Sequence, residues 1–177
     1  MANQFDLLFK VVLIGEFGVG KTSILNRFLD DTFLDSPPTP AITFAHKLLR
    51  VHDSLVKVQL WDIPGREDYL SMIKGFYRGA DGAFIVYDQS QEQTFSNVQK
   101  WLSYFREMEP DKRVVLLENK SDLEERAVEE SKVEEYVRSN DLLYRQVSAL
   151  SGENVTDAFN ALIKGTVWLM KRSTGRR

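Results

Sequence analysis

Cysteine is absent from the 177 residues of the chain, and its absence excludes several kinds of chemistry. Disulfides, thiolate metal sites and cysteine nucleophiles cannot form, and the chain carries no cysteine that could accept a prenyl group. Histidine is scarce, with only His46 and His52. We expect both to be solvated surface positions without a chemical role.

Long apolar runs and a large charge excess are lacking as well. No stretch approaches the roughly 18 apolar residues of a membrane span, and the opening MANQFDLLFK does not resemble a signal peptide because a charge interrupts its short apolar stretch. With 23 basic and 26 acidic residues, the net charge is −3, which gives no reason to expect a nucleic-acid partner. We expect one cytoplasmic domain over residues 1–170.

A basic tail over residues 171–177 is the local exception. Its cations are Lys171, Arg172, Arg176 and Arg177. They either complement the negative end of a helix dipole or contact an anionic membrane surface, and the sequence leaves both readings open.

Strand and helix patterns alternate along the chain, which predicts an α/β fold. Strands are expected at residues 9–14, 42–51, 55–61, 82–87, 114–117 and 142–147, and helices near 24–29 and at 94–108, 129–139 and 155–170. The link between the second and third strands is too short for a crossover helix, so these strands form an antiparallel hairpin. We predict a six-stranded, mostly parallel sheet with one antiparallel edge strand and about five helices on both faces. Residues 66–75 are read as a polar segment.

The first strand runs into GEFGVGKT, the pattern of a phosphate-binding loop. Its glycines let backbone N–H groups converge on an anion at the start of a helix. Lys21 supplies a charge for the terminal phosphates, and the Thr22 hydroxyl is placed to ligate Mg²⁺. The alternative is a flexible glycine turn with a surface lysine. The expected nucleotide contacts here are Gly15, Phe17, Gly18, Val19, Gly20, Lys21, Thr22 and Ser23.

Two further motifs follow the ends of later strands, where open α/β sheets bind ligands. In DIPG, Asp62 orients Mg²⁺ and the Gly65 N–H reaches a γ-phosphate. In NKSD, the Asp122 carboxylate accepts two hydrogen bonds from guanine, a pair that adenine lacks. Asn119 and Lys120 brace this loop; the alternative for NKSD is a plain polar turn. Residues 148–150 complete the base pocket: Ser148, Ala149, whose N–H faces the guanine carbonyl, and Leu150.

With these motifs in place, the chain resembles a small GTPase of the Ras superfamily, and within it a Rab, over about residues 7–170. KVQLWD, GFYRGADG and FIVYDQS are similar to stretches that mark Rabs. The resemblance implies GTP or GDP with Mg²⁺ as ligands, and effectors, an exchange factor and an activating protein as partners. It implies catalytic parts for Lys21, Thr39, Gly65 and Arg66, and metal contacts for Thr22, Thr39 and Asp62.

The resemblance also assigns aromatic and switch residues. Phe33 fits an aromatic that stacks edge-on against guanine. Phe44, Trp61 and Phe76 resemble a triad that Rab effectors read, although each could equally be a core aromatic. The loop up to Thr39 is one residue shorter than is usual in Rabs, so Thr43 is kept as an alternative to Thr39.

Departures from the family cluster near the γ-phosphate. Arg66 stands where most relatives carry a glutamine that positions water, and a guanidinium has no acceptor for that task; it could instead steady phosphate charge. Pro64 and the prolines at 37, 38 and 40 stiffen the switches. Phe17 either crowds the loop or turns outward, and Leu150 replaces a lysine. We therefore expect slow GTP hydrolysis.

Three readings of function follow. The first is a slow Rab-like switch that regulates vesicle traffic through effectors. The second is a pseudo-GTPase scaffold that binds guanine nucleotide without switching, and the third, disfavoured by NKSD, is a P-loop kinase. Membrane association is expected to be peripheral, on endomembranes, through a partner or a segment beyond this sequence.

Overall fold

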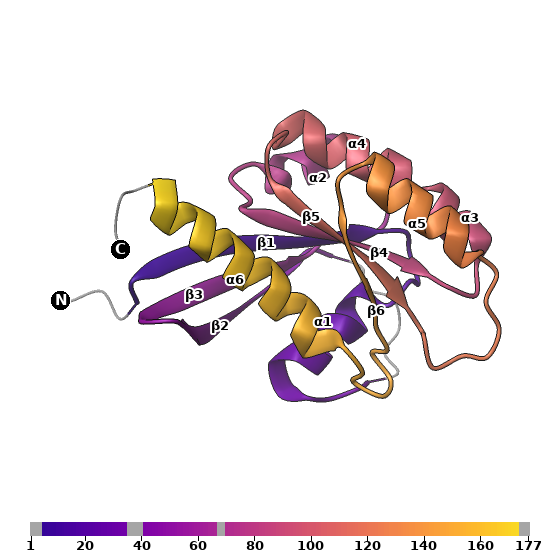
Figure 1. The fold of residues 1–177 in the computed structure, drawn as a ribbon, viewed down its shortest axis with the longest axis horizontal. Coiled ribbons are helices and arrows are strands. Elements are labelled where there is room, and N and C mark those ends of the chain that lie inside the picture. The colour runs from indigo at the N-terminus through magenta and orange to yellow at the C-terminus, as the bar shows by residue number, and fades with distance from the viewer. Residues whose placement is uncertain (1–4, 35–40, 67–69, 174–177) are drawn as a thin grey trace.

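A six-stranded sheet organises the chain, whose computed structural model describes residues 5–34, 41–66 and 70–173. The strands lie in the order β2-β3-β1-β4-β5-β6, and Figure 1 shows them fanned through the centre of the molecule. Their bounds are β1 (Leu7–Gly15), β2 (Thr43–Val51), β3 (Ser54–Asp62), β4 (Gly82–Asp88), β5 (Arg113–Asn119) and β6 (Leu143–Gln146). Only β2 is antiparallel to its neighbour. The predicted sheet and its antiparallel edge strand are confirmed.

Helices cover both faces of the sheet. On one face, α1 (Lys21–Asp30) and α6 (Val155–Ser173) pack on one set of strand side chains. On the other face lie α2 (Leu70–Tyr77), α3 (Glu92–Ser96), α4 (Val98–Met108) and α5 (Glu130–Ser139). Successive residues of β1 alternate between the two cores, with Val11 and Leu13 on the first and Val12 and Ile14 on the second, as the two-residue period of a strand requires. Phe28 of α1 and Phe159 of α6 stack with ring centroids 3.8 Å apart.

Two helical segments differ from the sequence-based expectation. The helix predicted at 94–108 is divided into α3 and α4 at Asn97, whose ψ of −6° departs from helical geometry. The polar segment predicted at 66–75 contains most of α2. This helix forms because Ile73 and Tyr77, four residues apart, bury one face among the aromatic and aliphatic side chains of the second core.

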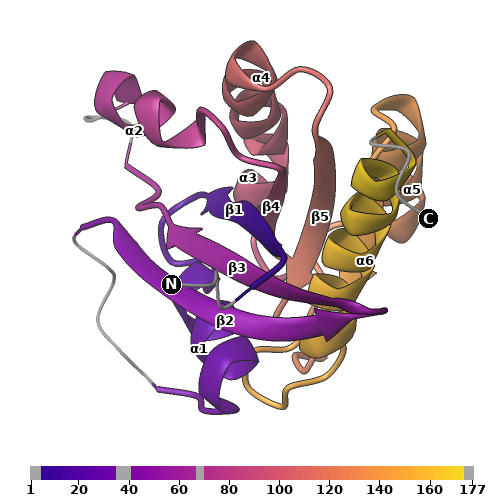
Figure 2. The ribbon, with the colours of Figure 1, turned by 90° about the vertical axis from the view of Figure 1, so that its left-hand side faces the viewer.

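The sheet brings the predicted motifs to one edge. The parallel strands β1, β3, β4 and β5 end at Gly15, Asp62, Asp88 and Asn119 respectively, and the register pairs Leu13 with Asp62 and Asp88 with Asn119. In the view of Figure 2, the β2–β3 hairpin crosses one side of the sheet, with α1 below it and α2 above. A site for phosphates and a base is therefore expected at this edge.

Candidate functional site

Glycine is required at two points where the motifs meet. Gly20, which precedes α1, has φ of 96°, and a Cβ there would lie 2.3 Å from the Asn119 side-chain nitrogen. At Gly65, a Cβ would lie 2.4 Å from the Gly15 carbonyl oxygen and from backbone atoms of Glu16 and Phe17. Real Cβ contacts are not this short, so only glycine lets DIPG rest directly on the phosphate loop.

Lys21 is held inside this loop. Its Nζ donates to the backbone carbonyls of Gly15, at 3.0 Å, and of Glu16, at 2.7 Å. Burial lowers the pKa of the Lys21 ammonium to about 8, while the carboxylates of Asp62 and Glu16 oppose that shift. The amine therefore lies inside the loop, and its contact with a terminal phosphate stays a prediction.

Thr22 and Asp62 form the second part of the site. The Thr22 hydroxyl donates to Asp62 Oδ2, and Asp62 is fully buried. Burial raises the pKa of the Asp62 carboxyl, although the Thr22 hydrogen bond and the Lys21 charge lower it. Among the described residues, the buried Oδ1 of Asp62 has no hydrogen-bond partner.

The Oδ1 atom of Asp62 and the hydroxyl oxygen of Thr22 fit a magnesium ion. Mg²⁺ takes hard oxygen ligands, commonly one or two protein groups together with substrate phosphates and water. A buried carboxylate oxygen without a partner, beside a hydroxyl, is such a set. Thr39, the third predicted metal contact, lies outside the described residues, as do the prolines at 37, 38 and 40. Thr43, the alternative to Thr39, begins β2 opposite Asp62 and is exposed.

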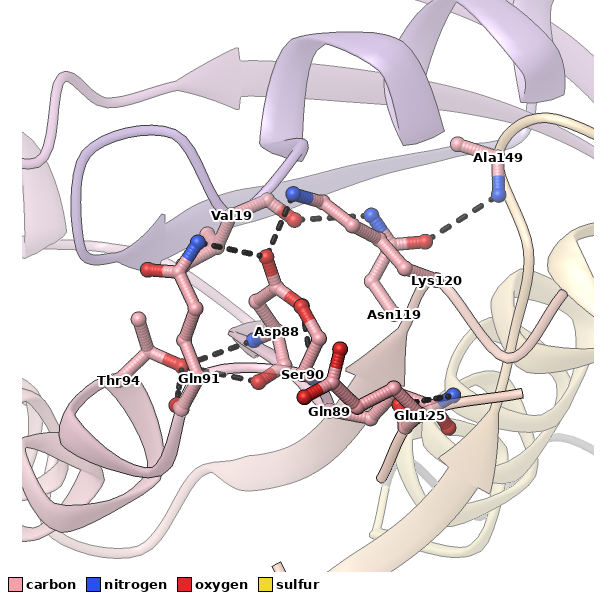
Figure 3. A network of polar contacts seen from close by, with 10 residues as sticks. All are labelled: Val19, Asp88, Gln89, Ser90, Gln91, Thr94, Asn119, Lys120, Glu125 and Ala149. Carbon is pink, nitrogen blue, oxygen red and sulfur yellow. Dashed lines mark hydrogen bonds and ion pairs between the residues drawn. The ribbon is translucent and has the colours of Figure 1, made fainter. Parts of the chain in front are cut away.

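Asn119 joins the NKSD loop to the GEFGVGKT loop. Its side-chain nitrogen donates to the Val19 carbonyl at 2.8 Å, and its side-chain oxygen accepts the Ala149 N–H at 3.2 Å. Lys120, with φ of 67°, forms an ion pair of 2.5 Å with Asp88 at the end of β4. Figure 3 shows these contacts converging between the strand ends. The predicted bracing role of Asn119 and Lys120 has a direct geometric basis.

Asp122 is oriented by a neighbouring hydroxyl. The Ser148 Oγ donates to Asp122 Oδ1 at 2.5 Å and accepts the Ser151 N–H at 3.0 Å. Ser148 is buried, while Asp122 is exposed to solvent at the cavity. The carboxylate is therefore fixed in direction but open to a ligand.

A single cavity of about 300 Å³ unites these groups. Its lining includes predicted residues from every motif and adds four others from the described chain, Asn26, Leu34, Pro64 and Leu123. Predicted residues in the lining are Phe17, Gly18, Gly20, Lys21, Thr22, Ser23, Phe33, Asp62, Gly65, Asn119, Lys120, Asp122, Ala149 and Leu150. Three further predicted residues do not line the cavity but form hydrogen bonds with residues that do: Gly15, Val19 and Ser148. Arg66 follows Gly65 as an exposed residue outside the lining.

Phe17 and Phe44 are exposed, whereas Trp61 and Phe76, the other two members of the aromatic triad, are half-buried against the second core. Phe17 is 55% exposed, so much of its side chain faces solvent, and both Phe17 and Pro64 line the cavity. Phe44 and Trp61 have ring centroids 4.8 Å apart, and Trp61 and Phe76 5.6 Å apart. Phe44 is 48% exposed. The three aromatics therefore form one continuous cluster across β2, β3 and α2. His46 and His52 are exposed, as expected.

Sequence reasoning missed two charged residues, Arg27 and Glu118, that support the loops of the site through hydrogen bonds. Arg27 of α1 donates to the carbonyls of Ala149 and Leu150, and Glu118 accepts hydrogen bonds from Tyr87, Tyr144 and Arg126. Glu118 had a signal in the sequence, because it is a charge that ends an apolar strand directly before NKSD. Arg27 had none, since an arginine on a helix is usually solvated.

Known proteins resemble this chain over most of its length. Residues 10–167 match the Ras family. Ras-related protein RABA6b of Arabidopsis thaliana is 44% identical over 164 residues, which cover 91% of this chain and 72% of that protein. Ras-related protein Rab11A of Nicotiana tabacum is 42% identical over 164 residues, covering 91% of this chain and 76% of that protein. No helix in the described part of the chain is both long and apolar enough to cross a membrane.

Proposed function

The chain belongs to the Ras family, as a Rab-like small GTPase, and from this membership we propose that it binds GTP and GDP with Mg²⁺ and acts as a slow switch in membrane traffic. One observation supports the ligand most directly: the residues predicted to read phosphate, metal and guanine line a single cavity. Asn119 joins the base-reading loop to the phosphate loop by hydrogen bonds. The arrangement therefore suits a ligand that carries both a base and phosphates.

Guanine selectivity is proposed to rest on Asp122. A carboxylate accepts from both N–H groups on one edge of guanine, whereas an amide in its place offers one donor and one acceptor. We expect Asp122→Asn to weaken GDP binding by at least about 100-fold and to favour xanthosine diphosphate, whose second carbonyl can accept from the new amide. Equilibrium titration with labelled nucleotides measures both. Asp141→Asn, a change in the turn before β6, is the matched control, and unchanged GDP affinity in Asp122→Asn would refute the assignment.

The metal contacts of this proposal are Thr22 and Asp62, with Thr39 as a further contact outside the described residues. When bound, Mg²⁺ would neutralise charge on the outer phosphates. Thr22 and Asp62 are already joined by a hydrogen bond in the protein, so little rearrangement is needed to present their oxygens together. Lys21 lies beside them as the cation for the terminal phosphates.

Slow hydrolysis is proposed to follow from Arg66. A guanidinium donates only, so it cannot accept a hydrogen bond from the attacking water as a glutamine carbonyl does. We expect Arg66→Gln to hydrolyse bound GTP at least about tenfold faster than the wild type in single-turnover assays, because it restores that acceptor. Arg138→Gln, which makes the same charge change on the exposed face of α5, is the control. A wild-type rate equal to or above that of Arg66→Gln would refute the proposal and leave Arg66 as a residue that steadies phosphate charge.

Effectors are proposed to read the switches together with Phe44, Trp61 and Phe76, and an exchange factor and an activating protein to control the nucleotide. The triad supports this surface because its rings are contiguous and Phe44 is exposed, although Trp61 and Phe76 also pack against the second core. Membrane contact is proposed to be peripheral. The side chains of the basic tail, residues 171–177, lie outside the described structure.

A pseudo-GTPase scaffold is the second candidate, favoured by the loss of the water-positioning residue at Arg66. The two candidates differ in whether the protein changes between nucleotide states. Hydrogen exchange of residues 33–43 and 62–77, measured with GDP and with a non-hydrolysable GTP analogue, separates them. Different protection supports the switch; identical protection supports the scaffold.

A further inference from the structure

Arg27 forms a connection that none of the nucleotide motifs contains. It lies on α1, six residues after Lys21, and its side chain is only 15% exposed. The guanidinium makes four hydrogen bonds, two to the loop after β6 and two to the residue that follows α1. A planar group with donors in a fixed fork holds its partners in one relative orientation.

Two of these bonds hold the loop that borders the base. Nε donates to the Ala149 carbonyl at 3.0 Å, and Nη2 donates to the Leu150 carbonyl at 2.7 Å. On its other side, Ala149 donates its N–H to the side-chain oxygen of Asn119 at 3.2 Å. That bond is at the long end of the usual range, so a ligand carbonyl can share the N–H. The carbonyl side of Ala149 is thereby fixed while its N–H stays available at the cavity.

The other two bonds hold the start of the segment that carries Phe33. Nη1 donates to the Asp31 carbonyl at 2.8 Å and to its Oδ1 at 2.9 Å. Asp31 ends α1 in the left-handed conformation, with φ of 54°. Phe33 and Leu34, two and three residues after Asp31, line the same cavity as Ala149 and Leu150. One side chain therefore supports two separate borders of the base pocket.

The chain makes room for this connection at Gly152. A Cβ there would lie 3.3 Å from Arg27 Cδ, and its φ is +87°. Such a contact is tighter than most side chains tolerate, and the backbone conformation favours glycine. The turn after the loop is thus compatible with an arginine packed against it.

We propose that Arg27 is a positioning residue for guanine: it fixes the Ala149 N–H where the base carbonyl binds and ties that loop to the segment bearing Phe33. This inference rests on the proposed function, since it concerns the same pocket. Arg27 contacts no ligand in this account; it acts through the two backbone segments. Its loss should weaken recognition at the guanine carbonyl and leave recognition by Asp122 intact, because Asp122 is oriented by the Ser148 hydroxyl, whereas the loop bonds of Arg27 go to the carbonyls of Ala149 and Leu150.

Three ligands separate these effects. GDP presents the carbonyl, 6-thio-GDP replaces its oxygen with a larger and weaker acceptor, and inosine diphosphate keeps the carbonyl but lacks the amino group read by Asp122. Affinities come from competition against a fluorescent GDP, at fixed Mg²⁺, for the wild type, Arg27→Gln and Arg27→Lys. Arg138→Gln is again the charge-matched control.

We expect Arg27→Gln to bind GDP at least about tenfold more weakly and to reduce the preference for GDP over 6-thio-GDP several-fold. The preference for GDP over inosine diphosphate should stay unchanged. Arg27→Lys, which keeps the charge but can reach only one segment at a time, should be intermediate; it also serves if the glutamine variant does not fold, as judged by circular dichroism.

Two results would overturn the inference: both preferences falling together, which indicates a general loss of structure, or neither changing. A wild-type protein that binds none of the three nucleotides would instead refute the proposed function. The two failures are therefore distinguishable.

Discussion

Glu118 offers the sharpest test of how the base-reading loop is supported. It is fully buried, and its Oε2 accepts hydrogen bonds from the Tyr87 hydroxyl, from Tyr144 at 2.6 Å and from Arg126 at 2.9 Å. Arg126 lies in the loop that follows NKSD, and its side chain is 26% exposed. The ion pair is thus asymmetric, because its carboxylate is fully buried whereas its guanidinium is partly exposed to solvent.

This asymmetry predicts that removing Arg126 lowers the free energy of unfolding more than removing the charge of Glu118 does. Arg126→Met leaves a buried carboxylate supported by neutral donors, and breaking a buried pair in this way costs about 3–5 kcal/mol. Glu118→Gln leaves a guanidinium that water can reach while the tyrosines still find an acceptor, so we expect about 2 kcal/mol, less than a full buried pair. For a domain of this size, 1 kcal/mol shifts the melting temperature by about 2–4 °C. The double variant should cost less than the sum of the single variants because the two groups interact.

Urea unfolding at a fixed, saturating concentration of GDP and Mg²⁺ measures these differences, because bound ligand itself adds to stability. Arg138→Met, on the exposed face of α5, should stay within about 0.5 kcal/mol of the wild type. Glu118→Gln costing as much as Arg126→Met would show that the burial argument is wrong. Strict additivity in the double variant would show that the charges do not interact.

Three further predictions follow from packing. Gly65→Ala should destabilise the protein by more than about 2 kcal/mol, because its Cβ would meet backbone atoms at 2.4 Å. Gly75→Ala in α2 should be neutral or slightly stabilising, because there is open space around this glycine. Thermal melts compare the two variants, and equal shifts in melting temperature would contradict the prediction. Phe44→Ala should change the free energy of unfolding by less than about 1 kcal/mol because the side chain is 48% exposed. Trp61→Ala should lower it by at least about 2 kcal/mol more, because the Trp61 ring lies between two others. The reverse order of the two variants in urea unfolding would disprove this prediction. Phe159→Leu should cost about 1–2 kcal/mol by removing a ring stacked at 3.8 Å, and a melting temperature unchanged within error would count against that stack.

Much of the fold and site could be predicted because their signals are local. The phosphate loop is contiguous, and its glycines, Lys21 and Thr22 act through backbone conformation and immediate neighbours. The strands were recognisable from continuous apolar runs, and the hairpin from a link too short to cross the sheet. The convergence of the motifs followed from a general property of parallel sheets.

Other features depended on packing between distant segments. The sequence predicts a polar segment in place of α2 because Gly75 and polar neighbours obscure the helical period, and the helix is stabilised by burying Ile73 and Tyr77 against the second core. The division between α3 and α4 at Asn97 likewise had no clear sequence signal. Local propensity is weak where tertiary contacts decide.

The sequence by itself determined which groups this protein presents: the glycine-rich loop, the carboxylate and hydroxyl of the proposed Mg²⁺ site, and the NKSD loop proposed to read the base, each specified by residue type and spacing. Only the tertiary structure decided how these parts are held relative to one another. The side chains of Asn119, Arg27 and Glu118 join segments 26 to 123 residues apart. Such contacts depend on where the folded backbone places each donor and acceptor. The strength of a hydrogen bond depends on its distance and angle, and the order of the residues does not specify either.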